Sequence, residues 1–284
     1  VTLSTVARWF DKRRGLMTGV VKSGTAAGQV CIPPIAALLI AGVGWQKAAM
    51  IMGAAAAVVL VFAASLMSLP PKSVAQSGAP QVGLTLAEAR RTRIFLSMCA
   101  LQFLFFPTLT TVPLHIVVYG IDLGLTPAEA ALLLSVTGAA SVLGRLVVGG
   151  FSDRIGGRLG YVLCFAPLIL ALSALLLIQT SGLLFVIMAV YGFGHGGCFT
   201  VVSPTVAEFF GTRAHGAIFG PVLFFGTIGG ASGPILAGWI FDVTGAYTLA
   251  FATLLGMLIA GLTLALTLPR RGRGPLGETS AAVA

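Results

Sequence analysis

Long apolar stretches recur along the chain and are separated by short polar segments. Each stretch approaches or exceeds the roughly 20 apolar residues that a membrane-spanning helix requires. They cover residues 15–40, 45–69, 93–118, 128–150, 159–179, 183–209, 215–241 and 246–268. The pattern predicts an all-α membrane protein with eight transmembrane helices.

Two polar segments differ from the short turns between these helices. Residues 70–92 are rich in Pro, Gly and Ser, and they are predicted to form a linker between two helix bundles. Thr85 and Glu88 have capping-box spacing, which favours a short interfacial helix inside this linker. Residues 269–284 begin with basic side chains and continue with small and polar ones, which is typical of a disordered tail.

The positive charges alternate between the two sides of the predicted membrane. Fourteen of the 17 Lys and Arg residues lie in the termini, the 70–92 segment and the other segments on that side. The opposite loops carry Lys47, while Lys22 and Arg145 fall inside predicted spans. Because Lys and Arg mark the cytoplasmic side, we expect a multi-pass protein of the plasma (inner) membrane with both termini and the linker in the cytoplasm.

Composition agrees with a membrane protein and argues against several other classes. Of the 284 residues 57% are apolar and 9% charged, and the mean hydropathy is +1.01, values that exclude an ordinary soluble domain. The net charge of +9 is spread over alternate loops, so no nucleic-acid partner is expected. The four cysteines occupy four different apolar runs without a CxxC pair, which predicts no metal site. We also expect no cofactor and no enzymatic activity.

A repeat relates the first predicted helix to a later one. Arg13 matches Arg213, and after one inserted residue the register stays constant at an offset of 201. The matched pairs are Gly15 with Gly216, Gly19 with Gly220, Gly28 with Gly229 and Pro33 with Pro234. A register kept over 19 positions favours a true internal repeat.

The polar turn between the fourth and fifth predicted helices carries a recognisable motif. It has the spacing G-x-x-x-D-R-x-G-x-R, formed by Gly149, Asp153, Arg154, Gly156 and Arg158. This motif resembles the inter-helix motif of the major facilitator superfamily, although a basic turn on the cytoplasmic side is a simpler interpretation. In the motif Gly149 would permit close helix packing, and Asp153 would cap a neighbouring helix. Glu208 would pair with Arg154, or with Arg158.

The resemblance implies a bundle of twelve helices in two halves, of which this chain would supply eight. Residues 1–69 would be a remnant of the N-terminal bundle, containing the end of helix 4 and helices 5 and 6. Residues 70–92 would be the cytoplasmic linker, and residues 93–268 a complete C-terminal six-helix bundle. The tail 269–284 would follow in the cytoplasm. On this interpretation the chain is truncated at its N-terminal side.

Further segments resemble the monocarboxylate and oxalate/formate transporter branch of that superfamily. They read WFDKRRGLMTGVVKSGTAAGQVCIPP, GLTLAEARRTRIF and YGFGHGGCF. In monocarboxylate-type carriers an arginine at the place of Arg145 contacts the substrate carboxylate, and an aspartate four residues earlier couples protons. This chain has Ser141 there, which puts proton coupling by that residue in doubt.

Three residues inside the predicted spans are candidates for binding a substrate: Arg145, Lys22 and His195. Ionisable groups inside a membrane are functional candidates by default. Arg145 and Lys22 could instead extend to the headgroups, and His195 could be a neutral packing residue. No Asp or Glu falls in the interior of a predicted span, where Glu129 and Glu208 lie only at span ends, so buried positive charge favours an anionic substrate.

We therefore expect a secondary active transporter of small organic anions, mono- or dicarboxylates, that works by alternating access. The substrate would be coupled to protons or exchanged for a counter-anion, and the lipid bilayer would be the surrounding partner. The alternatives are a truncated membrane protein or scaffold that does not transport, and a major-facilitator carrier for another small solute.

Overall fold

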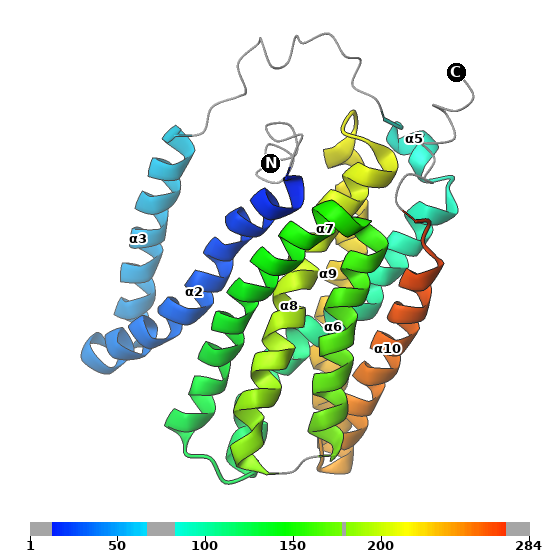
Figure 1. Cartoon of the computed structure of the whole chain (residues 1–284). Coiled ribbons are helices and arrows are strands. Elements are labelled where there is room, and N and C mark those ends of the chain that lie inside the picture. Colours follow the sequence, from blue (N-terminus) through cyan, green and yellow to red (C-terminus); the bar gives the residue numbers. More distant parts are fainter. Residues whose placement is uncertain (1–12, 67–82, 178–179, 271–284) are drawn as a thin grey trace, which may run out of the picture.

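The computed structural model describes residues 13–66, 83–177 and 180–270, which are almost entirely helical (Figure 1). The helices are α2 (Arg14–Val43), α3 (Trp45–Leu66), α5 (Leu86–Ala89), α6 (Arg93–Asp122), α7 (Pro127–Leu177), α8 (Ser181–Phe210), α9 (His215–Thr244) and α10 (Thr248–Thr267). Six of them, α3 and α6 to α10, are long and apolar enough to cross a membrane. The all-α membrane fold is thus confirmed, and the count of eight spans stays a prediction.

Helix α7 covers two of the expected helices, 128–150 and 159–179, as one element of 51 residues. Its backbone leaves helical geometry at Gly156, where φ is 81° and ψ is 168°. That conformation is almost confined to glycine, since a Cβ atom would clash with the backbone. The chain reverses there, so the two limbs of α7 run in opposite directions (Figure 1). The predicted polar hairpin is therefore shorter than expected, because one glycine suffices for the reversal.

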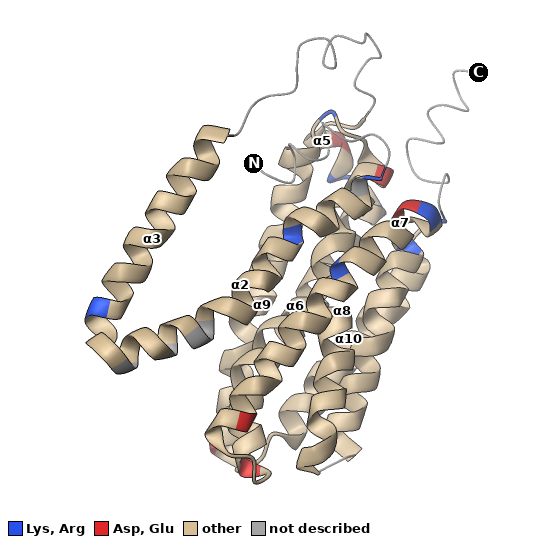
Figure 2. Ribbon diagram, turned by 60° about the vertical axis from the view of Figure 1, so that its left-hand side comes forward, with Lys and Arg blue, Asp and Glu red and all other residues tan. Residues whose placement is uncertain are grey.

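Helices α6 to α10 pack into one bundle around a shared apolar core. Helix α7 packs along α8 and α10, and α6 packs along α9. Members of this buried cluster run from Ala89 to Leu268, and among the side chains that the structure describes none comes from α2 or α3. Helix α2 lies against α7 and α8, whereas α3 packs on α2 and stands apart from the bundle (Figures 1 and 2).

The end of the linker is fixed to the bundle through α5. Glu88 Oε2 accepts a hydrogen bond from the backbone N–H of Thr85 at 2.7 Å, and Thr85 Oγ1 accepts from Glu88 N at 3.4 Å. This confirms the predicted capping box. The backbone N–H and hydroxyl of Thr85 hold the pKa of the Glu88 carboxyl below its usual range. Leu84 N donates to Phe210 O at 2.9 Å, which joins the linker to the end of α8. Most of the linker, residues 70–82, and the predicted tail from residue 271 lie outside the described residues.

Most charged residues lie toward the two ends of the bundle (Figure 2). We call the end that carries α5 the α5 end, and the opposite one the distal end. Blue Lys and Arg residues concentrate at the α5 end, whereas red Asp and Glu residues occur at both ends (Figure 2). The termini of the helices place Asp122, Glu129 and Asp242 at the distal end.

Candidate functional site

Helices α2 and α7 approach each other most closely where both carry glycine. A Cβ atom on Gly149 would lie 2.5 Å from the carbonyl oxygen of Gly15, and a Cβ on Gly15 would likewise meet Gly149 O. One turn further along, a Cβ on Gly19 would collide with the carbonyl oxygen of Arg145. Glycine on both helices is therefore what lets the two backbones touch.

Asp153 binds the N-terminus of α2, as the motif predicted. Its Oδ1 accepts a hydrogen bond from Gly15 N at 2.7 Å, and its Oδ2 accepts one from Leu16 N at 3.1 Å. The residue that precedes α2, Arg13, makes no side-chain capping bond. The first N–H groups of a helix lack internal partners and carry partial positive charge, so a carboxylate is favoured there. Asp153 thereby supplies from α7 a cap that α2 itself lacks.

Glu208 caps the start of the second limb of α7 in the same way. Its Oε2 accepts a hydrogen bond from Gly157 N at 2.7 Å, directly after the reversal at Gly156. Arg158 Nη1 donates to Leu268 O at 3.3 Å, which ties this limb to the end of α10. Arg154 is exposed between these contacts, and its predicted pairing with Glu208 stays a prediction.

Arg145 lies at the junction of α2, α7 and α8, with 1% of its surface exposed. Its Nη1 donates hydrogen bonds to the carbonyl oxygen of Lys22 and to Thr25 Oγ1, both on α2. Its Nε is buried and donates no hydrogen bond to any described residue. The guanidinium is thus held by one nitrogen, and it keeps an unused donor on another edge.

Lys22 and Arg145 share one aromatic ring. Arg145 Cζ lies 5.4 Å from the ring centroid of Phe199 on α8, and Lys22 Nζ lies 5.6 Å from the same centroid. Within about 6 Å of an aromatic face a cation is attracted by the ring. In residues 13–66, 83–177 and 180–270 neither cation forms an ion pair with a carboxylate. Two positive charges therefore meet at one ring without a neutralising partner in this part of the chain.

His195 adjoins the same ring. Its ring centroid lies 5.1 Å from that of Phe199 and 5.6 Å from that of Tyr191, and 2% of its surface is exposed. Its Nδ1 lies 3.4 Å from Ser141 Oγ, at hydrogen-bond distance. The three residues predicted to bind a substrate thus gather around Phe199, which we call the Phe199 cluster: Lys22, Arg145, His195 and Phe199.

Sequence reasoning missed Phe199 and Thr25. Phe199 follows His195 by four residues, so the helical period alone places both on one face of α8. Thr25 follows Lys22 by three residues, and its contact depends on how α2 crosses α7. Among the described residues no group of three or more His, Cys, Asp or Glu side chains could hold a metal ion.

The sequence of the chain is similar to those of known transporters. The family model described as Major Facilitator Superfamily matches residues 1–123 and 121–283. Monocarboxylate transporter 13 of Rattus norvegicus is 28% identical over 273 residues, which cover 94% of this chain and 63% of that protein. Monocarboxylate transporter 12 of Mus musculus is 26% identical over 88% of this chain and 58% of its own length.

A bacterial protein has a similar degree of sequence identity to this chain. The uncharacterized MFS-type transporter YhjX of Escherichia coli (strain K12) is 30% identical over 74% of this chain and 54% of its own length. The chain spans somewhat less than two thirds of the length of the curated relatives it matches. Since the family model covers nearly every residue, the chain belongs to the Major Facilitator Superfamily.

Proposed function

We propose that this chain acts in secondary active transport of small organic anions, mono- or dicarboxylates, with Arg145 as the substrate anchor. The observation that carries the proposal is the unused Nε donor of the buried Arg145 guanidinium. A guanidinium binds a carboxylate best through two parallel N–H groups. Because Nη1 is engaged by α2, the edge formed by Nε and Nη2 is the one available for a carboxylate.

Charge supports the same substrate class. A buried cation is costly unless something neutralises it, and ions inside membrane proteins mark substrate pathways. Lys22 and Arg145 point at one ring from two different helices, so a small anion between them would interact with both. A cationic solute would meet repulsion from both side chains.

The helices that hold the anchor support transport by alternating access. The backbone of Arg145 belongs to α7, whereas the acceptors of its Nη1 belong to α2. Asp153 holds the same two helices together nearer the α5 end. Separation of α2 from α7 breaks both sets of bonds, so the described arrangement corresponds to a carrier closed at its α5 end. A bound carboxylate would bridge the two helices at Arg145 and Lys22.

The relatives support the proposal through their names, which describe transporters of monocarboxylates. Coupling to protons requires a titratable group close to the anchor. Ser141 occupies the place of the coupling aspartate that the family resemblance implies, and it contacts His195. We therefore assign any proton coupling to His195, and exchange for a counter-anion is the other mode of operation.

The test is uptake of radiolabelled lactate and succinate by the chain in proteoliposomes. Arg145→Lys keeps the charge but loses the planar pair of donors. We expect uptake to fall about tenfold or more, the equivalent of one charge-assisted hydrogen bond. The matched control is Arg90→Lys, the same exchange at an exposed position at the α5 end. Wild-type uptake by Arg145→Lys would contradict the anchor role.

A wild-type chain that inserts normally without moving either anion would contradict transport by this chain alone. That result would favour a membrane protein or scaffold that does not transport. Inhibition of anion uptake by neutral or cationic solutes would point to another solute class. An imposed pH gradient that drives uptake would identify proton coupling, and stimulation by anions inside the vesicles would identify exchange.

A further inference from the structure

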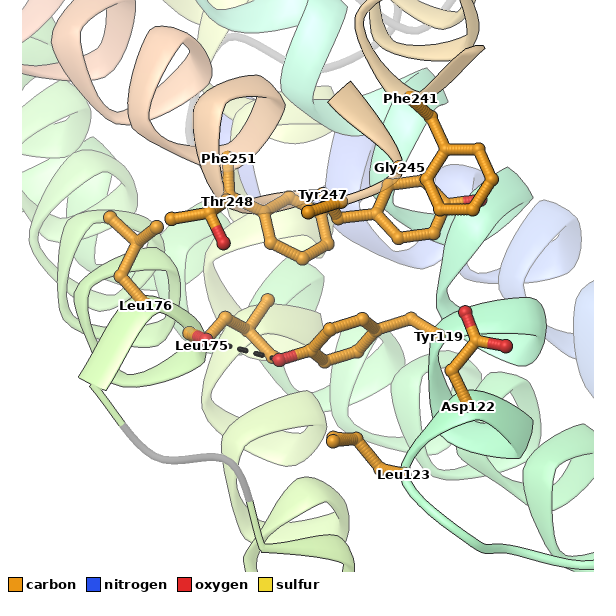
Figure 3. A pocket seen from close by; sticks show the side chains of 11 residues that line it. Tyr119, Asp122, Leu123, Leu175, Leu176, Phe241, Gly245, Tyr247, Thr248 and Phe251 are labelled. Carbon is orange, nitrogen blue, oxygen red and sulfur yellow. Dashed lines mark hydrogen bonds between the residues drawn. The ribbon is translucent and has the colours of Figure 1, made fainter. Parts of the chain in front are cut away.

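A second site lies at the distal end of the bundle, far from the Phe199 cluster. There a pocket of about 190 Å³ opens between the last turns of α6 and α7 and the turn that joins α9 to α10. Tyr119, Leu123 and Leu175 line one side, and Tyr247, Thr248 and Phe251 line the other (Figure 3). The pocket is smaller than the roughly 300–1,000 Å³ of sites for drug-sized ligands, so it suits a small molecule.

Four of the eleven lining residues are aromatic. Tyr247 stacks on Phe241 with centroids 4.4 Å apart and on Phe251 at 5.7 Å. Tyr119 meets Tyr247 and Phe251 edge-on at 6.0 and 5.3 Å. The faces of such rings carry partial negative charge. A wall of this kind attracts cations and apolar groups, and it disfavours anions.

The hydroxyl groups of two rings are already engaged by other residues of the chain. Tyr119 Oη donates to Leu175 O at 3.3 Å, and Tyr247 Oη lies 3.2 Å from His115 Nδ1. These bonds fix the orientation of both rings before a ligand arrives. A preformed wall lowers the entropic cost of binding.

Asp122 places a negative charge at the rim, beside Tyr119 (Figure 3). Within the described residues its carboxylate forms no hydrogen bond and no ion pair. Glu129 and Asp242 add negative charge to the same end, and the Lys and Arg residues between positions 94 and 269 are Arg145, Arg154, Arg158 and Arg213. The last three belong to the α5 end, and Arg145 lies inside the bundle. Nothing positive in the described six-helix bundle therefore offsets Asp122.

We propose that this distal pocket binds a small alkylammonium ion, with its charge paired with Asp122 and its methyl or methylene groups against Tyr119, Tyr247 and Phe251. The aromatic faces and the carboxylate both attract a cation, so both favour binding of the ammonium group. The ligand chemistry is opposite to that of the Phe199 cluster. The ammonium can come from a free solute or from a lipid headgroup, since the pocket lies at an end of the bundle.

The experiment measures equilibrium binding of radiolabelled choline to the chain in nanodiscs of phosphatidylglycerol, a lipid without an ammonium group. We expect saturable binding that unlabelled tetramethylammonium displaces. The neutral isostere 3,3-dimethyl-1-butanol has the shape of choline without its charge, and it should compete about tenfold more weakly or worse. Equal competition by the neutral isostere would overturn a cation site.

Two variants separate the pocket from the general charge of the distal end. Asp122→Asn should weaken choline binding about tenfold or more, because it removes the paired charge with little change in shape. Asp242→Asn removes the same charge at the same end outside the pocket lining, and it should change the dissociation constant by less than about twofold. Equal weakening by both variants, or no saturable binding to the wild type, would overturn the proposal.

Two further measurements address folding and the source of the ligand. Tyr119→Leu removes one ring, and Tyr119→Phe keeps it. Weaker binding by the leucine variant with retention by the phenylalanine variant is expected, and equal binding by all three forms would contradict the aromatic wall. Repeating the assay in phosphatidylcholine nanodiscs identifies the source: a raised apparent dissociation constant assigns the site to lipid headgroups, and an unchanged one assigns it to free solutes.

Discussion

The carboxylate of Asp153 accepts a hydrogen bond from the backbone N–H of Gly15 at 2.7 Å, so a single side chain on α7 holds the first turn of α2 against the bundle. The neighbouring glycine pair keeps the two backbones close enough for this bond. A change at either place should loosen α2 without disturbing the core of α6 to α10.

Asp153→Asn is the first test of this relationship. The amide keeps an acceptor but loses the charge, so the capping bonds should weaken by about 1–2 kcal/mol. Hydrogen exchange of the amides of Gly15 and Leu16 should become about five- to thirtyfold faster at that cost. Exchange of the same amides at the wild-type rate would contradict the capping role.

Glu208→Gln is the matched control for that variant, because it removes a carboxylate that caps the second limb of α7. It should speed exchange at Gly157 and leave the start of α2 unchanged. Faster exchange across both helices in either variant would indicate general destabilisation instead of a local effect.

Gly149→Ala should separate α2 from α7. Its added methyl would lie 2.5 Å from Gly15 O, which the backbone cannot avoid without moving apart. Overpacking of this kind costs about 1–3 kcal/mol. Gly150→Ala is the control on the next residue, where the nearest atom is Leu16 Cδ1 at 3.8 Å. The unfolding temperature in detergent should be lowered by Gly149→Ala and hardly changed by Gly150→Ala.

Much of this end of the molecule could be predicted from the sequence. The spacing of Gly149 and Asp153 predicted both the close approach and the capped helix, because each depends on local backbone chemistry. Glu208 was expected to pair with Arg154, and it accepts a hydrogen bond from the backbone N–H of Gly157. Opposite charges are visible in a sequence, whereas an exposed N–H group appears only once the reversal at Gly156 is known.

The Phe199 cluster could be predicted in part. Arg145, Lys22 and His195 were conspicuous as ionisable groups in apolar runs. Their convergence on one ring depends on the rotation of α8 about its axis and on the crossing of α2 over α7. Those quantities come from side-chain packing between helices, which the hydrophobic pattern of one helix does not determine.

Lys22 should favour substrates with two carboxylates. If one carboxylate binds Arg145, the ammonium of Lys22 is available to the second, so dicarboxylates should bind more tightly than monocarboxylates of similar size. Lys22→Met should remove this preference and leave monocarboxylate affinity less affected. Competition of succinate and butyrate against labelled substrate measures both. An unchanged preference in the variant would exclude Lys22 from the site.

The orientation of the chain predicts which end reacts with reagents outside the cell. Single cysteines are introduced at Gly124, which lies at the distal end, and at Arg91, which follows α5, in a chain whose own cysteines are replaced by serine. A membrane-impermeant maleimide should label residue 124 in intact cells and residue 91 after permeabilisation. The reverse pattern would contradict the orientation that the positive charges predict.

Gly156→Ala tests the reversal in α7. A backbone with φ of 81° and ψ of 168° is strained for any residue with a Cβ atom. The substitution should therefore lower the free energy of unfolding by about 1–3 kcal/mol. Because the two limbs form part of the bundle core, we expect a lower unfolding temperature for the whole bundle. Unfolding at the wild-type temperature would show that the reversal tolerates a side chain.

The absence of α2 and α3 from the shared apolar core has a consequence for synthesis. These helices are synthesised before α6 to α10, and the acceptor for the N-terminus of α2 lies 138 residues later in the chain. At about 5–20 residues per second, translation takes roughly 7 to 28 s to reach it. During that time the first N–H groups of α2 depend on water or headgroups, and the helix can join the bundle only after α7 has been made. The order in which these helices are made is therefore the reverse of the order in which they dock.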